Sequence, residues 1–178
     1  IDVAEIDNLL LDLVANNPKF MPHLHLSLQA GDDLILKRMK RRHRRQEVID
    51  FSEKVRRLRP EIVLGADIIT GFPTETKTMF DNTYQLVQEC NILHLHVFPY
   101  SERKNTPAAR MPQVVKKIRK TRAKQLIALG EKMINEHYQR LSGQVLSILL
   151  EGGNKGRAED YSLVHVRDQS LEPGNIIR

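Results

Sequence analysis

The sequence contains one cysteine in 178 residues and no apolar run long enough to cross a membrane. A single cysteine cannot form an intrachain disulfide, and it cannot supply the several thiolates that hold an iron–sulfur cluster. Cys90 follows the apolar stripe of a predicted helix, which favours a buried, unreactive thiol. No signal peptide is visible, and the cysteine usage suits a reducing compartment, so we expect a cytoplasmic protein.

Two common catalytic patterns are also missing, namely a Ser/His/Asp arrangement and a phosphate-binding P-loop. The composition is 40% hydrophobic and 28% charged, as in ordinary globular domains. The net charge of +6 favours an anionic partner such as nucleic acid. The chain opens on Ile1 without Met, and its last β pattern stops at Arg178, so we expect a piece of a longer protein.

Three strand-like segments recur about 35 residues apart with helical patterns between them, which is typical of βαβ units and a parallel sheet. His23–Gln29 and Ile92–Phe98 alternate strictly, whereas Ile62–Ile69 is apolar on both faces apart from Gly65 and Asp67. Three parallel strands are too few for a closed eight-stranded barrel. The sequence therefore predicts an α/β fold containing the second half of a partial (βα) barrel.

The helices are predicted from apolar spacing and capping residues. Asp2 and Glu5 resemble a capping box. The expected apolar faces are Ile6, Leu9, Leu10 and Leu13; Val48, Phe51, Val55 and Leu58; and Met79, Phe80, Tyr84 and Val87, the last behind a Thr74 or Thr76 cap.

The last third of the sequence predicts a long helix and then a small β module. The helix spans 114–141 and is basic in its first half, and β-like patterns follow at 144–151 and 161–166. We predict three parts: a half barrel over residues 1–112, a connecting basic helix over 113–140, and a small all-β module over 141–178.

Two His-x-His pairs invite a metal hypothesis. With Asp67, the pairs at 23/25 and 94/96 could form a barrel metallohydrolase. Active sites of such barrels lie at the carboxyl ends of the strands, and His25 lies about 13 Å below Gln29 at about 3.3 Å per residue. We therefore expect no metal, and packed or hydrogen-bonded histidines instead.

Polar groups at the predicted strand ends suit a nucleoside-type cofactor. Ser27 and Gln29 end the first strand, the second runs from Asp67 into the turn at Gly71, and the third ends near Phe98. Glycine permits close approach of a ligand to the backbone, and exposed backbone near Phe98 could pair with an adenine edge. The sequence pattern does not identify a catalytic residue.

Several motifs together resemble one family, the radical S-adenosylmethionine (SAM) methylthiotransferases. They are His-Leu-His-Leu-Ser-Leu-Gln-Ala-Gly31, Leu36-Lys-Arg-Met-Lys-Arg41, Gly65-Ala-Asp-Ile-Ile-Thr-Gly-Phe-Pro-Thr-Glu-Thr76, Leu95-His-Val-Phe-Pro-Tyr-Ser101 and Thr106-Pro-Ala-Ala109. The third strand motif is most similar to the enzymes that modify threonylcarbamoyladenosine next to the tRNA anticodon. The segment from Leu141 looks like the start of the family's TRAM domain, an RNA-binding β module.

The resemblance implies SAM and 4Fe-4S clusters as cofactors, and sulfur and methyl transfer to C-2 of the adenine. It implies that Ser27, Gln29, Asp67, Gly71 and Phe98 line the SAM site, and that Arg103 lies where substrate approaches. The family's three-cysteine motif is absent, so the cluster ligands are expected upstream of Ile1. Lys104-Asn105 replaces the family's usual Pro-Gly, and Asn tolerates the left-handed backbone that such a turn needs.

The run from Lys37 to Arg45 has seven Lys or Arg in nine residues. A solvated charged face is the plain interpretation; phosphate binding is the functional one. We predict that Arg41, Arg42, Arg44 and Arg45 contact tRNA. The expected partner is tRNA and not a membrane, and the expected state is a monomer. A non-enzymatic RNA-binding module is the remaining alternative.

Overall fold

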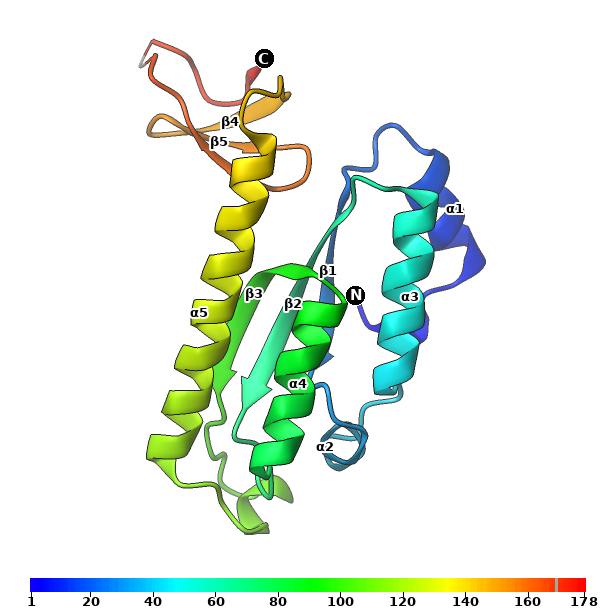
Figure 1. Ribbon diagram of the computed structural model, residues 1–178, viewed down its shortest axis with the longest axis vertical. Helices are drawn as coiled ribbons and strands as arrows, with labels where there is room; N and C mark the ends of the chain where they lie inside the picture. Colours follow the sequence, from blue (N-terminus) through cyan, green and yellow to red (C-terminus); the bar gives the residue numbers. More distant parts are fainter. Residues whose placement is uncertain (169) are drawn as a thin grey trace.

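The computed structural model describes residues 1–168 and 170–178 (Figure 1). Strands β1 (His23–Gln29), β2 (Val63–Thr70) and β3 (Ile92–Pro99) form a parallel sheet in the order β1-β2-β3. Helices α3 (Arg45–Leu58) and α4 (Lys77–Glu89) cover one face, and α5 (Lys116–Leu141) packs along β3 (Figure 1). The three predicted parallel strands are thus confirmed. No helix in the described ranges is long and apolar enough to cross a membrane.

β1 alternates as predicted because one of its faces packs under helices. Leu26 and Leu28 are fully buried in the main core, while His25 and Ser27, which alternate with them, face the polar side. The Ile1 ammonium donates to the His25 carbonyl at 2.8 Å, and the Ser27 amide donates to the Ile1 carbonyl at 2.8 Å. This is the pairing of a parallel neighbour, on the β1 edge opposite β2, so β1 is hydrogen-bonded on both edges, as a barrel strand is.

The N-terminal helix differs from the prediction. Asp2 caps only a 3₁₀ turn, η1 (Val3–Glu5), and α1 (Asn8–Asn16) begins at a second cap, where Asp7 accepts from the Leu10 amide at 2.8 Å. The extended backbone at Ile6 separates the two segments and rotates the helix. Leu9 is therefore 80% exposed and Leu13 40%, so half of the predicted apolar stripe was wrong, whereas Ile6 and Leu10 do pack against the core. The buried α1 side chains are Leu11 and Val14.

The remaining helices follow their predicted faces closely. Short helix α2 (Asp33–Arg38) is capped by Asp32, and α4 by Thr76, one of the two predicted caps. Leu58 of α3 is exposed instead of buried, and in α4 Thr83 and Leu86 replace Met79 and Tyr84 in the buried set. Met79 and Tyr84 are half-buried and still pack against buried residues.

The small β module is present at the end of α5 (Figure 1). Strands β4 (Ile148–Gly152), β5 (Lys155–Ala158), β6 (Leu163–His165) and β7 (Ile176–Ile177) form an antiparallel sheet in the order β6-β5-β4-β7. β5 was not predicted, because Lys-Gly-Arg-Ala lacks an alternating pattern, and β4 starts later than expected. The module lies near the amino ends of β1 and β3 (Figure 1). The predicted domain boundaries and the TRAM assignment stay predictions.

A tyrosine joins the module to the main sheet. The Tyr161 ring stacks on His23 with centroids 4.7 Å apart and meets His94 edge-on at 5.6 Å. On α5, His137 Nε2 pairs with Asp160 Oδ2 at 2.7 Å. The first histidine of each His-x-His pair is therefore packed against protein, as predicted.

Burial favours the neutral form of both His23 and His94. Desolvation, with the neighbouring His23 as a further cause, lowers the pKa of His94 from 6.5 to about 4. Desolvation likewise lowers the pKa of His23, with His25 adding to the shift. The folded state thus binds fewer protons than the unfolded chain between these values, so stability falls as the pH falls through this window.

We predict that the melting temperature drops as the pH is lowered from 6.5 to about 4, and that His94→Gln flattens this drop by removing the depressed titration. Exposed His165 of β6 provides the matched control, since His165→Gln leaves the buried cluster intact. Thermal melts across this pH range test the prediction. Parallel profiles for the two variants would show that His94 does not titrate with unfolding.

Candidate functional site

The carboxyl end of β1 has a strained backbone at Gln29. The register with β2 shifts between Leu26 and Gln29, and Gln29 has a φ of 69°. Gln29 is 9% exposed, and its side-chain amide has no hydrogen-bond partner among residues 1–168 and 170–178. Bulges and left-handed non-glycine residues concentrate at functional sites, so this is the strongest single indicator of a ligand position.

The turn after β2 is organised by one buried carboxylate. The Glu75 Oε1 atom accepts from the Gly71 amide at 2.8 Å and from Arg122 Nη1 of α5 at 2.6 Å. Glu75 is 5% exposed, and burial raises its pKa, opposed by the Gly71 amide and Arg122. The Gly71 turn is therefore attached directly to α5.

The side-chain position of Gly71 is filled by another residue. A Cβ at this site would overlap Arg119 Cγ, and the φ of 69° also favours glycine. Arg119 in turn donates to the Tyr100 carbonyl at 3.1 Å and to Glu102 at 2.9 Å. The expected close approach at Gly71 is thus made by α5 itself, and a direct cofactor contact at Gly71 stays a prediction.

Asp67 lies deeper in the sheet than the other predicted cofactor residues. Its Oδ1 accepts from His25 Nε2 at 3.0 Å and His96 Nδ1 at 3.2 Å. Burial alone would raise the Asp67 pKa, but these two histidines lower it overall. Since Asp67 is four residues before Gly71, about 13 Å separate the two along β2. Gln29 and Gly71 are thus brought to the strand ends, Ser27 lies two residues below Gln29, and Asp67 lies lower.

Among the described residues, His25, Asp67 and His96 form the group that most resembles the metal site considered from the sequence. One ligand atom from each of His25, Asp67 and His96 lies within 4.8 Å of the others. The sequence analysis grouped both pairs with Asp67 but did not say which histidine of each pair meets it, which follows from the register of β1 and β3 on either side of β2. Both imidazoles bind the carboxylate directly, as expected for hydrogen-bonded histidines.

The loop after β3 forms the third side of this end of the sheet. Phe98 is 52% exposed, and β3 is an edge strand, so half its backbone groups face away from β2. Exposed Arg103 precedes a turn in which Asn105 has a φ of 67°, confirming the predicted left-handed residue. A second small core holds these loops together, formed by Ala30, Ile35, Leu36 and Phe72, with η2 (Ala108–Arg110) packed nearby.

Most of the predicted RNA-binding arginines have partners within the chain. Arg42 pairs with Glu5 at 2.5 Å, and Arg41 lies 3.6 Å from Asp2. Arg45 pairs with Glu89 at 2.5 Å and donates to the Asn82 carbonyl at 2.7 Å, so it links α3 to α4. Arg44 is exposed at the start of α3. Their contact with RNA stays a prediction.

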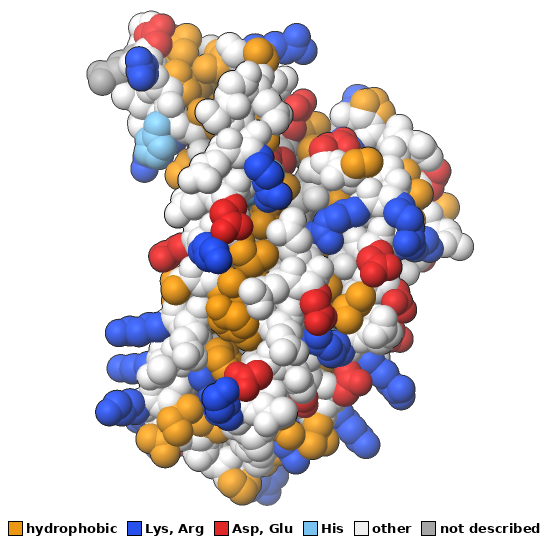
Figure 2. Space-filling model, viewed as in Figure 1, with side chains coloured by type: hydrophobic (Ala, Val, Ile, Leu, Met, Phe, Trp, Pro, Cys, Tyr) orange, Lys and Arg blue, Asp and Glu red, His pale blue; other side chains and the backbone are white. Residues whose placement is uncertain are grey.

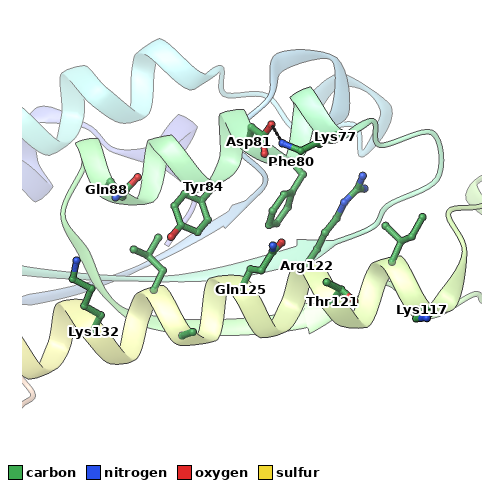
Figure 3. Close-up of a pocket in the computed structure, with 13 residues that line it drawn as sticks. Lys77, Phe80, Asp81, Tyr84, Gln88, Lys117, Thr121, Arg122, Gln125 and Lys132 are labelled. Carbon is green, nitrogen blue, oxygen red and sulfur yellow. Dashed lines mark hydrogen bonds and ion pairs between the residues drawn. The ribbon is translucent and has the colours of Figure 1, made fainter.

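A large hollow lies elsewhere, between α4 and α5 (Figure 3). It measures about 820 Å³, and Phe80, Tyr84 and Leu129 contribute to its wall. We place the candidate site at the strand ends instead, because the strained backbone and free polar groups converge there. Cys90 takes no part, since it is fully buried and burial raises the pKa of its thiol.

Comparison with known proteins supports the fold. Residues 5–87 match the radical SAM superfamily. Coproporphyrinogen III oxidase from Escherichia coli, a radical SAM enzyme, has a similar fold, with a TM-score of 0.59 at 19% identity over 75% of this chain and 31% of that one. The predicted α/β fold with a partial parallel barrel is confirmed.

The relatives confirm the resemblance to radical SAM methylthiotransferases. The chain is 52% identical over its full length to the threonylcarbamoyladenosine tRNA methylthiotransferase MtaB of Rickettsia prowazekii, covering 42% of it. It is 33% identical over 97% of its length to MtaB of Bacillus subtilis, covering 38%. It is 36% identical over 98% to the tRNA-2-methylthio-N(6)-dimethylallyladenosine synthase of Mycobacteroides abscessus, covering 38%. The chain thus spans about two fifths of these relatives.

The two faces of β1 should respond differently to mutation. In the full-length protein, Leu26→Ala leaves a cavity in the core and should cost about 2–5 kcal/mol of unfolding free energy. Gln29→Ala should change stability little and weaken cofactor binding, because no protein group satisfies its amide. Thermal melts and equilibrium binding of SAM measure both effects. Unfolding by Gln29→Ala with a tolerated Leu26→Ala would contradict this assignment of the faces.

Proposed function

Because this chain belongs to the radical SAM superfamily, we propose that it is part of a tRNA methylthiotransferase. The proposed reaction adds a methylthio group to C-2 of N6-threonylcarbamoyladenosine next to the anticodon. The observation that carries the proposal is the 52% identity, over all 178 residues, to a relative named for this reaction. The relatives named for the dimethylallyl substrate are 34–36% identical, and the MtaB relatives of Bacillus subtilis and Aquifex aeolicus are 33–34% identical, so the choice of the threonylcarbamoyl substrate rests on the Rickettsia prowazekii relative.

The strand ends suit SAM. The free amide of Gln29, the Ser27 hydroxyl and the half-exposed ring and edge backbone of Phe98 offer polar and stacking contacts for a nucleoside with an amino-acid group. Asp67 would act from below, its carboxylate held ionised by two histidines. Gly71 would shape the adjoining turn. SAM, together with a reduced 4Fe-4S cluster, would supply the radical chemistry, and these residues would bind and orient it.

The cluster itself requires ligands from outside this chain. Iron–sulfur clusters are held by several cysteine thiolates, and the one cysteine here is buried with a raised pKa. The parent protein would therefore supply the clusters, and this chain alone would be inactive.

Substrate tRNA would approach past Arg103, which is exposed on the loop after β3. The β module at the other end of α5 would act as a TRAM-like domain on a more distant part of the same tRNA. Two linked weak contacts strengthen each other through effective concentration. We place the enzyme in the cytoplasm as a monomer acting on tRNA, and not on a membrane.

Anaerobic reconstitution tests the proposal. The full-length protein should bind iron and sulfide and form 5′-deoxyadenosine from SAM, whereas residues 1–178 alone should do neither. A stoichiometric four-iron cluster on this chain alone would refute the division of labour. Stoichiometric zinc or manganese, lost on His25→Ala and His96→Ala, would instead favour the metallohydrolase suggested by the cluster around Asp67.

A further inference from the structure

The first half of α5 separates its two kinds of basic residue. Residues 116–124 contain six Lys or Arg, of which the two arginines point inward and the four lysines outward. Arg119 is 4% exposed and Arg122 is 8% exposed. Their guanidinium groups donate to acceptors such as Glu102 and Glu75. Guanidinium suits such multiple buried contacts, and the compact lysine ammonium does not. The arginines therefore hold the helix in place.

The four lysines make no such contacts that hold the helix in place. In the described ranges 1–168 and 170–178, none of their ammonium groups lies within 4.0 Å of a carboxylate, whereas Lys77 and Lys132 nearby pair with acids on their own helices. All four side chains are exposed. Figure 2 shows basic side chains projecting in a row at the lower left, over the first half of α5. We call Lys116, Lys117, Lys120 and Lys124 the lysine stripe.

The lysine stripe begins beside the candidate site. Lys116 and Lys120 line a hollow of about 340 Å³ together with Tyr100 and Glu102, in the loop that follows β3. Lys117 lines the neighbouring groove between α4 and α5 (Figure 3). Through Arg119 and Arg122, this part of α5 is attached to the Gly71 turn and the loop after β3. The stripe therefore keeps a fixed position relative to the strand ends.

We propose that the lysine stripe binds the phosphate backbone of RNA and guides it to the strand ends. The inference rests on the proposed function for the identity of the RNA. Residues four apart on a helix lie about 6 Å apart along its axis, so Lys116, Lys120 and Lys124 present three charges along one line. Free ammonium groups at a fixed spacing position a nucleic acid without reading its sequence.

The lysine stripe is a better candidate for phosphate binding than the predicted arginine run. Arg41, Arg42 and Arg45 already have acidic partners, so a phosphate would have to compete with an ion pair at each. At the four lysines, a phosphate would displace only bound water. Counterion release from RNA then adds directly to affinity.

The test measures tRNA affinity of the full-length protein at several salt concentrations. The variant Lys116→Gln/Lys120→Gln should weaken binding and lower the log–log salt slope by about 1.4–1.8, at about 0.7–0.9 per phosphate contact. Lys116→Arg/Lys120→Arg should restore the slope, because the charge returns. Melting temperature should stay constant in both, since neither lysine is buried.

Lys19→Gln/Lys54→Gln is the matched control. Both residues are exposed, neither has an acidic partner in the described ranges, and the net charge changes equally. Equal slopes for the control and the stripe variant would overturn the inference. That result leaves the proposed function intact if the full-length enzyme still methylthiolates tRNA, so the two failures are distinguishable.

Discussion

The buried carboxylate of Glu75 is the contact on which the functional end of this molecule depends. It lies between the Gly71 amide and the Arg122 guanidinium, so one side chain fixes the turn after β2 and the start of α5 together. Removing one partner of a buried ion pair costs about 3–5 kcal/mol, because the other charge stays buried without compensation. Arg119 extends the junction to the loop after β3. The positions of the β2 and β3 ends therefore depend on two arginines of one helix.

This junction accounts for the distribution of charge. Because the Arg119 and Arg122 side chains are buried, the basic side chains that α5 exposes to solvent over its first half are all lysines. The same helix then carries the β module to the amino ends of the strands, where Tyr161 stacks on His23. A cofactor site, a phosphate-binding helix face and a second RNA-binding module would then follow one another along a rigid element. That order suits an enzyme that must hold a large RNA while one base reaches its cofactor.

The sequence predicted the parallel strands, the buried thiol and the left-handed Asn105 correctly, because each depends on local pattern or on one residue's conformational preference. It failed at α1, because Asp2 caps only a 3₁₀ turn and the helix begins at a second aspartate cap, Asp7. It missed β5, whose partners rather than its own residues make it a strand. It also counted Arg41, Arg42 and Arg45 as free charges, since their partners are 37 to 44 residues away in sequence. At Gly71 it predicted the turn but not the arginine that fills the space beside it.

We propose that the parent protein methylthiolates threonylcarbamoyladenosine in tRNA. Mass spectrometry of tRNA nucleosides, from cells with the gene deleted and then restored, tests it most directly. Deletion should remove the methylthio group from threonylcarbamoyladenosine alone, and the full-length gene should restore it. An unchanged nucleoside profile, or loss of the methylthio group from dimethylallyladenosine instead, would contradict it.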